Sequence, residues 1–480
     1  LGLAPGNPNG TYLQAVPMTG HTPHPTLSFT THGRTLPLEF GGEYVAMSHL
    51  LRPDVAGQRV PVVFAGYGIV APEYGWDDYK DVDVRGKLVL MLAEDPPLPD
   101  PRDSTRLDPL RFKGATATYR GFSQSKRDEA ARHGAAAVLI INNPARVPLQ
   151  VYLNSARAEQ FDLAPGPNEV VPAAFDARLG LATVQRLADA AGLNLTALLR
   201  QALQPGFRSV PLGDLTADFS LHSDLRQINS RNVVARLPGS DPQLKDEYVV
   251  YTSHWDHVGR DRSRPGDQIF NGAADNAAGT AQMLEMAGAF ARLKVRPKRS
   301  ILFIATTAEE QGLLGSRYYC QHPLYPLART VANINHDGAS FWGPTRDVIN
   351  VGAGLSALDE PLRAAAAMQG RRWSADPYLE EAFFYRSDQF PFAQAGVPAA
   401  FPSSGDDVVD RPAGYAQARF ADYFAHDYHQ PSDEIKPDWN LAGAALDAQW
   451  LLLAGYLVAQ NPAPPQWQPG AEFSRPAPRP

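Results

Sequence analysis

The feature that most constrains the fold of this chain is an apolar run of strand-forming residues that ends abruptly in polar ones, YVVYTSHWDHVG at residues 248–259. Such a run is typical of a buried strand that delivers polar side chains to a site at its carboxyl end. His254 and Asp256 are two positions apart, so on an extended backbone both point to the same side. The carboxylate could then brace the imidazole while the other ring nitrogen binds a metal. A hydrogen-bonded strand-end histidine would give the same pattern, so other parts of the chain must distinguish the two.

From Asn232 onward, apolar strand-like runs alternate with segments of helical periodicity. The predicted strands are residues 233–237, 248–252, 301–306 and 331–335. A helix is predicted at residues 275–293, with Met283, Leu284, Ala287 and Phe290 inward, and a last apolar helix at 440–459. This alternation predicts an α/β domain with a mostly parallel central sheet flanked by helices.

The preceding part of the chain predicts a separate, β-rich module with few candidate catalytic residues. Two or three strands are expected in the first fifty residues, at 12–16 and 26–30 among others. Strands at 60–69, 87–92 and 135–141 follow, together with helices at 126–133 and 181–203. We therefore expect an inserted domain at residues 51–210, between 1–50 and 211–465 of one larger domain, and an extended proline-rich tail at 466–480.

Composition excludes some classes of function. The formal net charge of -7 and the absence of a basic stretch argue against nucleic acid as a partner. The longest apolar runs are too short to predict a membrane span. Cys320 is the single cysteine, so no internal disulfide can form. The chain opens on Leu1 without a signal-like segment, so we expect any targeting signal in an upstream segment.

Acids and histidines recur where the predicted strands end. Each has an ordinary explanation, such as a helix N-cap for Asp275, a solvated first helical turn for Glu309 and Glu310, or a turn for Asp337. His429 in its loop could equally be a surface residue. Together these residues favour a ligand-binding site, because ligands bind at the carboxyl ends of strands in open α/β sheets. Two histidines with several carboxylates suit zinc, and the number of carboxylates suits two ions that share one aspartate.

These segments resemble the co-catalytic di-zinc aminopeptidases, the bacterial leucyl aminopeptidase type that is related to the transferrin receptor and glutamate carboxypeptidase. The matching motifs are SHWDHVG (253–259), GAADNAAGTA (272–281), TTAEEQGLLGS (306–316), NINHDG (333–338), RSDQFPFAQAGVP (386–398) and DYHQPSDE (427–434). Together they cover nearly all of residues 230–460. Residues 60–145 resemble the protease-associated domain that is inserted in many members.

The resemblance implies a role for each matching residue. His254 and Asp337 would complete one zinc site, Glu310 and His429 would complete the other, and Asp275 would bridge the two ions. Asp256 would orient His254. Glu309 would act as the general base, taking a proton from the metal-activated water and passing it to the leaving amine.

Three residues in these motifs raise further expectations. Gln389 stands where the family has a histidine after Ser387-Asp388, which would alter local hydrogen bonding more than the metal site. Tyr385 could donate to the developing oxyanion or could be a packed aromatic residue. His257 is expected to have a structural role or to contact a ligand rather than to bind metal.

The sequence therefore predicts a zinc aminopeptidase that acts on peptides and, by the resemblance, is periplasmic or secreted. The same metal frame also serves carboxypeptidases and glutaminyl cyclases, and Arg386 and Arg411 are thin evidence for the basic cluster that a carboxypeptidase needs. A non-catalytic, receptor-like binding protein is the alternative from another class, although such members lose ligands. Residues 405–424 are expected to form part of the pocket wall.

Overall fold

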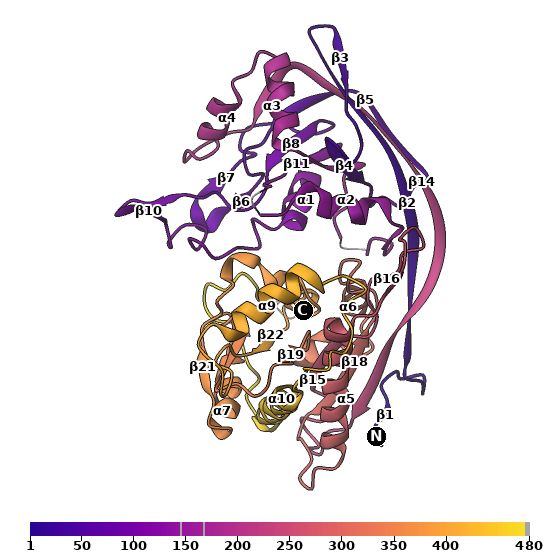
Figure 1. Cartoon of the computed structure of the whole chain (residues 1–480), viewed down its shortest axis with the longest axis vertical. Helices are drawn as coiled ribbons and strands as arrows, with labels where there is room; N and C mark the ends of the chain where they lie inside the picture. The colour runs from indigo at the N-terminus through magenta and orange to yellow at the C-terminus, as the bar shows by residue number, and fades with distance from the viewer. Residues whose placement is uncertain (145, 167–168, 476–480) are drawn as a thin grey trace. The chain divides into compact units, whose positions relative to one another are not determined.

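The computed structural model describes residues 1–144, 146–166 and 169–475, which divide into two compact units. The first unit comprises Leu1–Val16, Asn229–Tyr378 and the chain from Phe383 onward, and the second comprises Pro17–Ile228 with Leu379–Ala382. Their boundaries fall inside two long strands, β2 (Leu13–Thr31) and β14 (Val210–Leu237), which are hydrogen-bonded neighbours (Figure 1). These boundaries separate two compact units and do not identify domains. An inserted domain at residues 51–210 therefore stays a prediction.

The first unit is built on a mostly parallel sheet, as predicted. β15 (Tyr248–His254) lies between β18 (Ser300–Thr306) and β19 (Thr330–Asn335) and is parallel to both, and β22 (Ala399–Ser404) is parallel to β19. The last part of β14 adds an antiparallel neighbour to β18. Beyond β22 lie β20 (Asp347–Val351), antiparallel, and β21 (Arg372–Ser374), parallel to β20.

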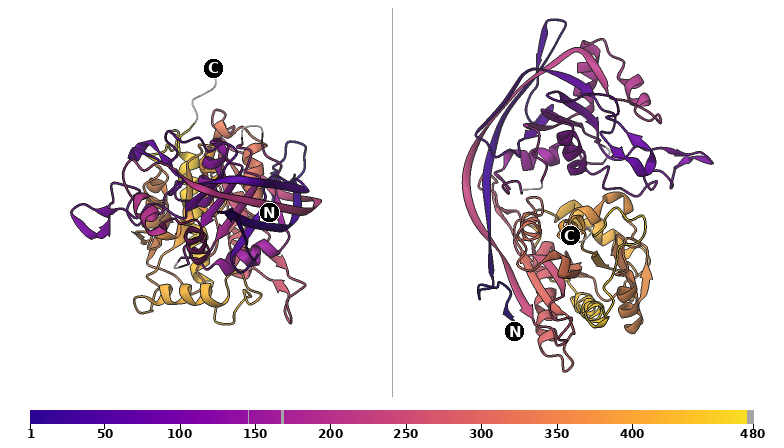
Figure 2. Two further views of the ribbon diagram at one scale, coloured as in Figure 1. Left: turned by 90° about the horizontal axis from the view of Figure 1, so that it is seen from above. Right: turned by 180° about the vertical axis from the view of Figure 1, so that it is seen from behind.

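Helices cover both faces of this sheet, because alternate strand residues are apolar on both sides. One face packs against α5 (Ala278–Ala291), α7 (Asp359–Met368) and α10 (Ala442–Gln460), and the other against α6 (Leu314–Gln321) and α8 (Gln389–Gln394). The remaining helix, α9 (Tyr415–His426), precedes the loop of His429. The strands and helices of this unit can be followed from two sides in Figure 1 and Figure 2. The predicted α/β architecture is therefore confirmed.

One apolar helix is long enough to cross a membrane by length and composition alone. This helix is α10, and 56% of its most apolar stretch is buried inside the structure. Trp450, Leu451 and Val458 lie in the core, and the Trp450 indole donates to the carbonyl of Leu362 on α7. Its apolar character is accounted for by packing within the first unit.

Two details of the predicted helices are wrong. Leu284 is 52% exposed, because it lies on the solvent side of α5 next to the buried Met283. The predicted helix at residues 181–203 is two helices, α3 (Leu181–Ala190) and α4 (Leu195–Gln201). The chain breaks at Gly192, which has a positive φ of 67°, and restarts at Asn194, whose side chain caps α4.

The second unit has its own hydrophobic core. Four of its strands are successive parallel neighbours: β5 (Asp54–Phe64), β8 (Leu88–Leu92), β11 (Ala137–Ile141) and β13 (Phe175–Leu179). β4 (Tyr44–Met47) pairs antiparallel with β13, and the first part of β14 pairs antiparallel with β5. The helices of this unit are α1 (Ser123–Arg132), α2 (Leu149–Arg157), α3 and α4.

Candidate metal centre

His254 is the last residue of β15, and its imidazole is almost completely buried. Its Nδ1 lies 2.8 Å from the backbone carbonyl oxygen of Asp256. Its Nε2 therefore faces the carboxylates, at 3.2 Å from Asp275 Oδ1, 3.3 Å from Asp337 Oδ1 and 4.0 Å from Glu309 Oε2. A ring that donates from one nitrogen and turns the other toward several oxygens has the orientation of a metal ligand.

Asp275 lies between the two histidines. Its Oδ1 faces His254, and its Oδ2 lies 3.2 Å from His429 Nε2, which is also 3.0 Å from Glu310 Oε2. Asp275 is not in a regular helix, because α5 begins only at Ala278 and the backbone of Asp275 is non-helical, with φ -117° and ψ 90°. Asp433, from the loop after α9, accepts hydrogen bonds from the backbone nitrogen atoms of Ala274 and Asp275. The loop after α9 thus fixes, through Asp433, the backbone of Asp275, whose carboxylate could bridge two ions.

The carboxylate of Asp256 does not contact the His254 ring, which it was predicted to brace. Its carboxylate accepts hydrogen bonds from the hydroxyl of Thr307 and the backbone nitrogen of Ala308, and only its backbone carbonyl contacts His254. The prediction assumed an extended backbone, but β15 ends at His254 and the next residues leave the strand. Asp256 therefore fixes the turn after β18 that presents Glu309 and Glu310, and it orients His254 through the main chain.

Two further side chains, His257 and Ser387, hydrogen-bond to the predicted ligands. His257 Nδ1 lies 2.7 Å from Glu310 Oε1, which leaves the other oxygen of Glu310 facing His429. The hydroxyl of Ser387 donates to Asp337 Oδ2 at 2.6 Å, which leaves Oδ1 facing His254. Each carboxylate thus turns one oxygen inward because its other oxygen is already occupied.

Gln389 fits without leaving a buried polar group unsatisfied. Its side-chain oxygen accepts from Asn335 Nδ2 at 2.9 Å, and its Nε2 donates to the carbonyl of Phe384 at 2.7 Å. Asn335 Nδ2 also donates to Ser387 Oγ at 2.8 Å, so Gln389 lies at the end of a hydrogen-bonded row that reaches Asp337. The hydrogen bonds of Gln389 itself go to Asn335 and Phe384, neither of which is a candidate ligand.

The hydroxyl of Tyr385 is engaged elsewhere. It donates to Glu472 Oε2 at 2.6 Å, and the side chain is buried beside Phe384 and Phe390. A role in binding an oxyanion stays a prediction, and it would require this hydroxyl to leave Glu472. Another tyrosine, Tyr428, stacks on the ring of His429 with centroids 3.9 Å apart, and no sequence pattern singled it out.

The electrostatics of the cluster are dominated by carboxylates. Burial alone would lower the pKa of His254, but Asp337 and Glu309 raise it well above its usual value. Burial alone would also lower the pKa of His429, but Asp275 and Glu310 raise it to about 10. Burial raises the pKa of Glu309 well above its usual value, and Glu310 adds to this. Four carboxylates thus face two imidazoles.

The residues fit zinc. Two groups of atoms close enough to share an ion are present in the described chain, one with His254, Asp275 and Glu310 and one with His254, Glu309 and Asp337. His429 Nε2 is buried and, although close to two carboxylates, makes no hydrogen bond among the described residues. Because His429 Nε2 lies near two carboxylate oxygens without the geometry of a hydrogen bond, a metal ion could be bound between the nitrogen and the oxygens. Nitrogen and oxygen donors in this number are typical of zinc sites.

The match to known proteins covers this centre. Residues 232–453 match the model of peptidase family M28. Leupeptin-inactivating enzyme 1 of Streptomyces exfoliatus is 28% identical over 246 residues, 49% of this chain and 50% of that protein. Aminopeptidase YwaD of Bacillus subtilis is 33% identical over 199 residues, 40% of this chain and 37% of that protein. Mouse aminopeptidase NAALADL1 is 36% identical over 152 residues, 30% of this chain and 18% of that protein. The matched regions span half or less of these relatives.

Among solved structures, the chain matches the aminopeptidase from Aneurinibacillus sp. strain AM-1. The TM-score is 0.47 at 18% sequence identity, over 97% of this chain and 86% of that one. All five predicted metal ligands and Glu309 lie within the residues that match the family.

Proposed function

We propose, on the premise that residues 232–453 form a peptidase family M28 domain, that this chain is a zinc-dependent aminopeptidase that removes N-terminal residues from peptides. The observation that carries the proposal is the convergence of two histidines and four carboxylates at the ends of three neighbouring strands and two loops. The names of two relatives, both aminopeptidases, agree with it.

The distances favour a division of the ligands between two zinc ions. His254 and Asp337 would hold one ion, Glu310 and His429 the other, and Asp275 would offer one oxygen to each. When bound, the ions would polarise the scissile carbonyl and lower the pKa of the attacking water.

Glu309 is placed to move the proton. It is buried beside the cluster, 4.0 Å from His254 Nε2, and no hydrogen bond commits it to another side chain in the described chain. Its carboxylate would accept a proton from the water as the water oxygen bonds to the carbonyl carbon. It would then donate that proton to the leaving amine nitrogen as the carbon–nitrogen bond breaks. Asp256 would keep Glu309 in position through the turn that it holds.

The alternatives have less support. A carboxypeptidase that cleaves acidic residues needs convergent basic groups, but the guanidinium groups of Arg386 and Arg411 lie over the rings of Phe383 and Tyr415. A receptor-like protein would be expected to lack ligands, whereas all predicted ligands are present here.

The test is a panel of aminoacyl chromogenic substrates, each with a free and a blocked N-terminus, assayed with and without a chelator. We expect turnover of free-amine substrates, loss of turnover with the chelator, and recovery when zinc is restored. Cleavage of N-blocked peptides from the C-terminus would instead indicate a carboxypeptidase. A purified protein that binds no zinc would favour the receptor-like alternative.

The resemblance also underlies two further parts of the proposal. Residues 51–210 would be a protease-associated domain, and the protein would act in the periplasm or outside the cell. Fractionation of cells that express the natural gene tests the location, since recovery of the protein only from the cytoplasm would contradict it.

A further inference from the structure

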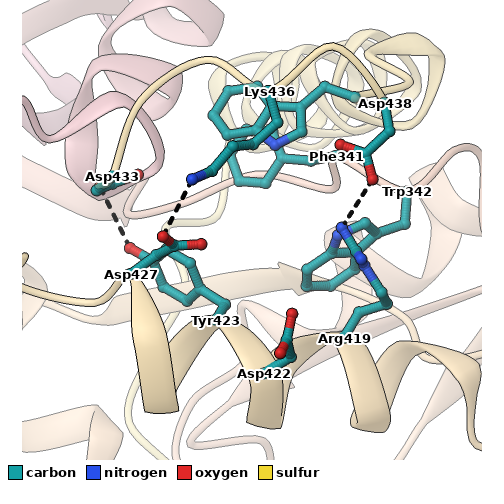
Figure 3. A pocket seen from close by; sticks show the side chains of 10 residues that line it. Phe341, Trp342, Arg419, Asp422, Tyr423, Asp427, Asp433, Lys436 and Asp438 are labelled. Carbon is teal, nitrogen blue, oxygen red and sulfur yellow. Dashed lines mark hydrogen bonds and ion pairs between the residues drawn. The ribbon is translucent and has the colours of Figure 1, made fainter.

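A cavity of about 220 Å³ lies in the first unit, beside the loop that carries His429 but apart from the candidate ligands (Figure 3). It is lined by Phe341, Trp342, Arg419, Asp422, Tyr423, Asp427, Asp433, Lys436, Asp438 and Trp439. None of these ten residues is a predicted metal ligand. Asp427 and Asp433 flank His429 in sequence, and Asp433 also holds the backbone of Asp275. The proposed peptidase mechanism leaves this cavity without a role.

Four of the ten lining residues are aromatic: Phe341, Trp342, Tyr423 and Trp439. Phe341 and Trp439 stack with ring centroids 4.0 Å apart, and Trp342 stands nearly perpendicular to Phe341, at an interplanar angle of 83°. Tyr423, on α9, also lines the cavity. Aromatic faces attract organic cations through the negative potential above the ring.

The charges of the lining are unbalanced. Four carboxylates face two basic side chains. Lys436 Nζ is paired with Asp427 at 3.0 Å, and Arg419 Nη2 with Asp438 at 3.2 Å, so both bases are committed. Asp433 is buried and bonded to backbone nitrogen atoms. The excess negative charge therefore lies with the inner Asp433 and with Asp422.

Asp422 is the carboxylate open to a ligand. One of its oxygens lies 3.1 Å from the Nδ1 of the exposed His426, which is outside the cavity lining. In Figure 3 its carboxylate points into the space between Arg419 and Tyr423, with no interaction drawn to another lining residue.

We propose that this cavity binds a small organic cation, an alkylammonium or guanidinium group, between the aromatic rings and Asp422. A hard metal ion would need several converging oxygen ligands, but Asp427 and Asp438 are paired with bases and Asp433 with backbone nitrogen atoms. An anion would meet the surplus of carboxylates. The volume suits a group the size of a lysine or arginine side chain, whether it belongs to a peptide or to a free amine. Because Asp427 and Asp433 flank His429, the bound cation would restrain the loop that supplies this ligand.

The first experiment uses the full chain stripped of zinc, so that it does not depend on peptidase activity. Butylguanidinium is titrated against intrinsic tryptophan fluorescence, to which Trp342 and Trp439 contribute, and neutral butylurea serves as the matched probe. We expect a saturable change with the cation only, about threefold to fivefold weaker in Asp422→Asn and also weaker in Trp342→Leu. Glu360→Gln removes an exposed carboxylate on α7 and should bind like the parent.

The second experiment distinguishes the two sources of the cation in the zinc-loaded protein. The ratio of kcat/KM for peptides beginning with arginine to that for peptides beginning with neutral citrulline is compared between the parent and Asp422→Asn. A lower ratio in the variant assigns the cavity to the peptide side chain. An unchanged ratio, with weakened butylguanidinium binding, assigns it to a free amine. The proposal is overturned if no saturable change occurs, if butylurea acts like the cation, or if Glu360→Gln weakens binding as much as Asp422→Asn.

Discussion

Each unit contains a buried polar cluster, and the two clusters differ in charge balance. In the second unit, His49 lies 2.8 Å from Asp162 and 3.8 Å from Asp176, and Arg127 lies 2.9 Å from Asp176. Two acids thus face two bases. Burial acts to lower the pKa of His49, but Asp162 and Asp176 raise it to about 9, so this histidine is charged at neutral pH.

The cluster of the first unit does not balance in this way. Its three histidines, His254, His257 and His429, face four carboxylates, which are Asp275, Glu309, Glu310 and Asp337. Burying a charge costs free energy unless a partner compensates it. A cluster that compensates itself can stay buried without added cations, whereas one with surplus carboxylates needs cations from outside. This difference distinguishes a structural cluster from a candidate metal site better than the number of polar residues does.

The largest expected effect is on turnover. Glu309→Gln should lower kcat by about 10³-fold, because the amide cannot accept the proton of the attacking water. Zinc content should be retained, since the five proposed ligands are unchanged. Glu285→Gln, at an exposed position of α5, is the control. Near-normal turnover of the Glu309→Gln variant with both ions bound would contradict the proposed role.

Breaking the balanced cluster should affect stability instead. Asp176→Asn leaves Arg127 and His49 without one buried partner, so we expect the free energy of unfolding to fall by about 3 kcal/mol. Zinc affinity should not change. Asp189→Asn, at an exposed position of α3, should cost less than about 0.5 kcal/mol. Denaturant unfolding measures the free energy of unfolding of both variants. Equal losses in Asp176→Asn and Asp189→Asn would show that the balanced cluster does not contribute to stability.

Zinc binding should release protons. The raised pKa values mean that His254 and His429 are protonated in the metal-free protein at neutral pH. Their contribution to metal-free stability is full below the unfolded value near 6.5 and, for His429, is lost as the pH rises through about 10. Since each of the two zinc ions displaces one of these protons, the affinity for each ion should rise by up to about tenfold per pH unit around neutrality.

Calorimetry in buffers of different ionisation enthalpy should give about two protons per protein, with any third from Glu309. Asp176→Asn serves as the comparison, because the balanced cluster should not contribute. Fewer than one proton released would show that the histidines are neutral before zinc binds.

The smallest expected effect concerns the orientation of Asp337. Ser387→Ala removes the hydrogen bond to Asp337 Oδ2, so the affinity for one of the two ions should fall about tenfold. Ser300→Ala is the matched control, because this buried hydroxyl contacts only backbone atoms. Competition with a chromogenic chelator measures the affinities, and identical values for the two variants would mean that Ser387 does not position the ligand.

Much of the fold could be predicted because its signals are local. The strands that became β15, β18 and β19 were predicted to within two residues at each end, since buried parallel strands are continuous apolar runs. The break between α3 and α4 was missed, although Gly192 and Asn194 were a signal for it. Leu284 was misplaced because its apolar side chain is exposed, and single exposed apolar residues carry no pattern.

The sequence by itself indicated most of the chemical groups at the carboxyl edge of the sheet, because His254, Glu309, Glu310 and Asp337 follow apolar runs, whereas Asp275 and His429 lie in loops. Only the tertiary structure decided which atom of each group faces inward. Ser387, His257 and Asp433 occupy the outer atoms of their partners, and Asp256 turns its carboxylate to Ala308 instead of His254. The physical reason is the separation of the partners along the sequence. A strand pattern covers a few neighbouring residues, whereas these hydrogen bonds join residues 50 or more positions apart.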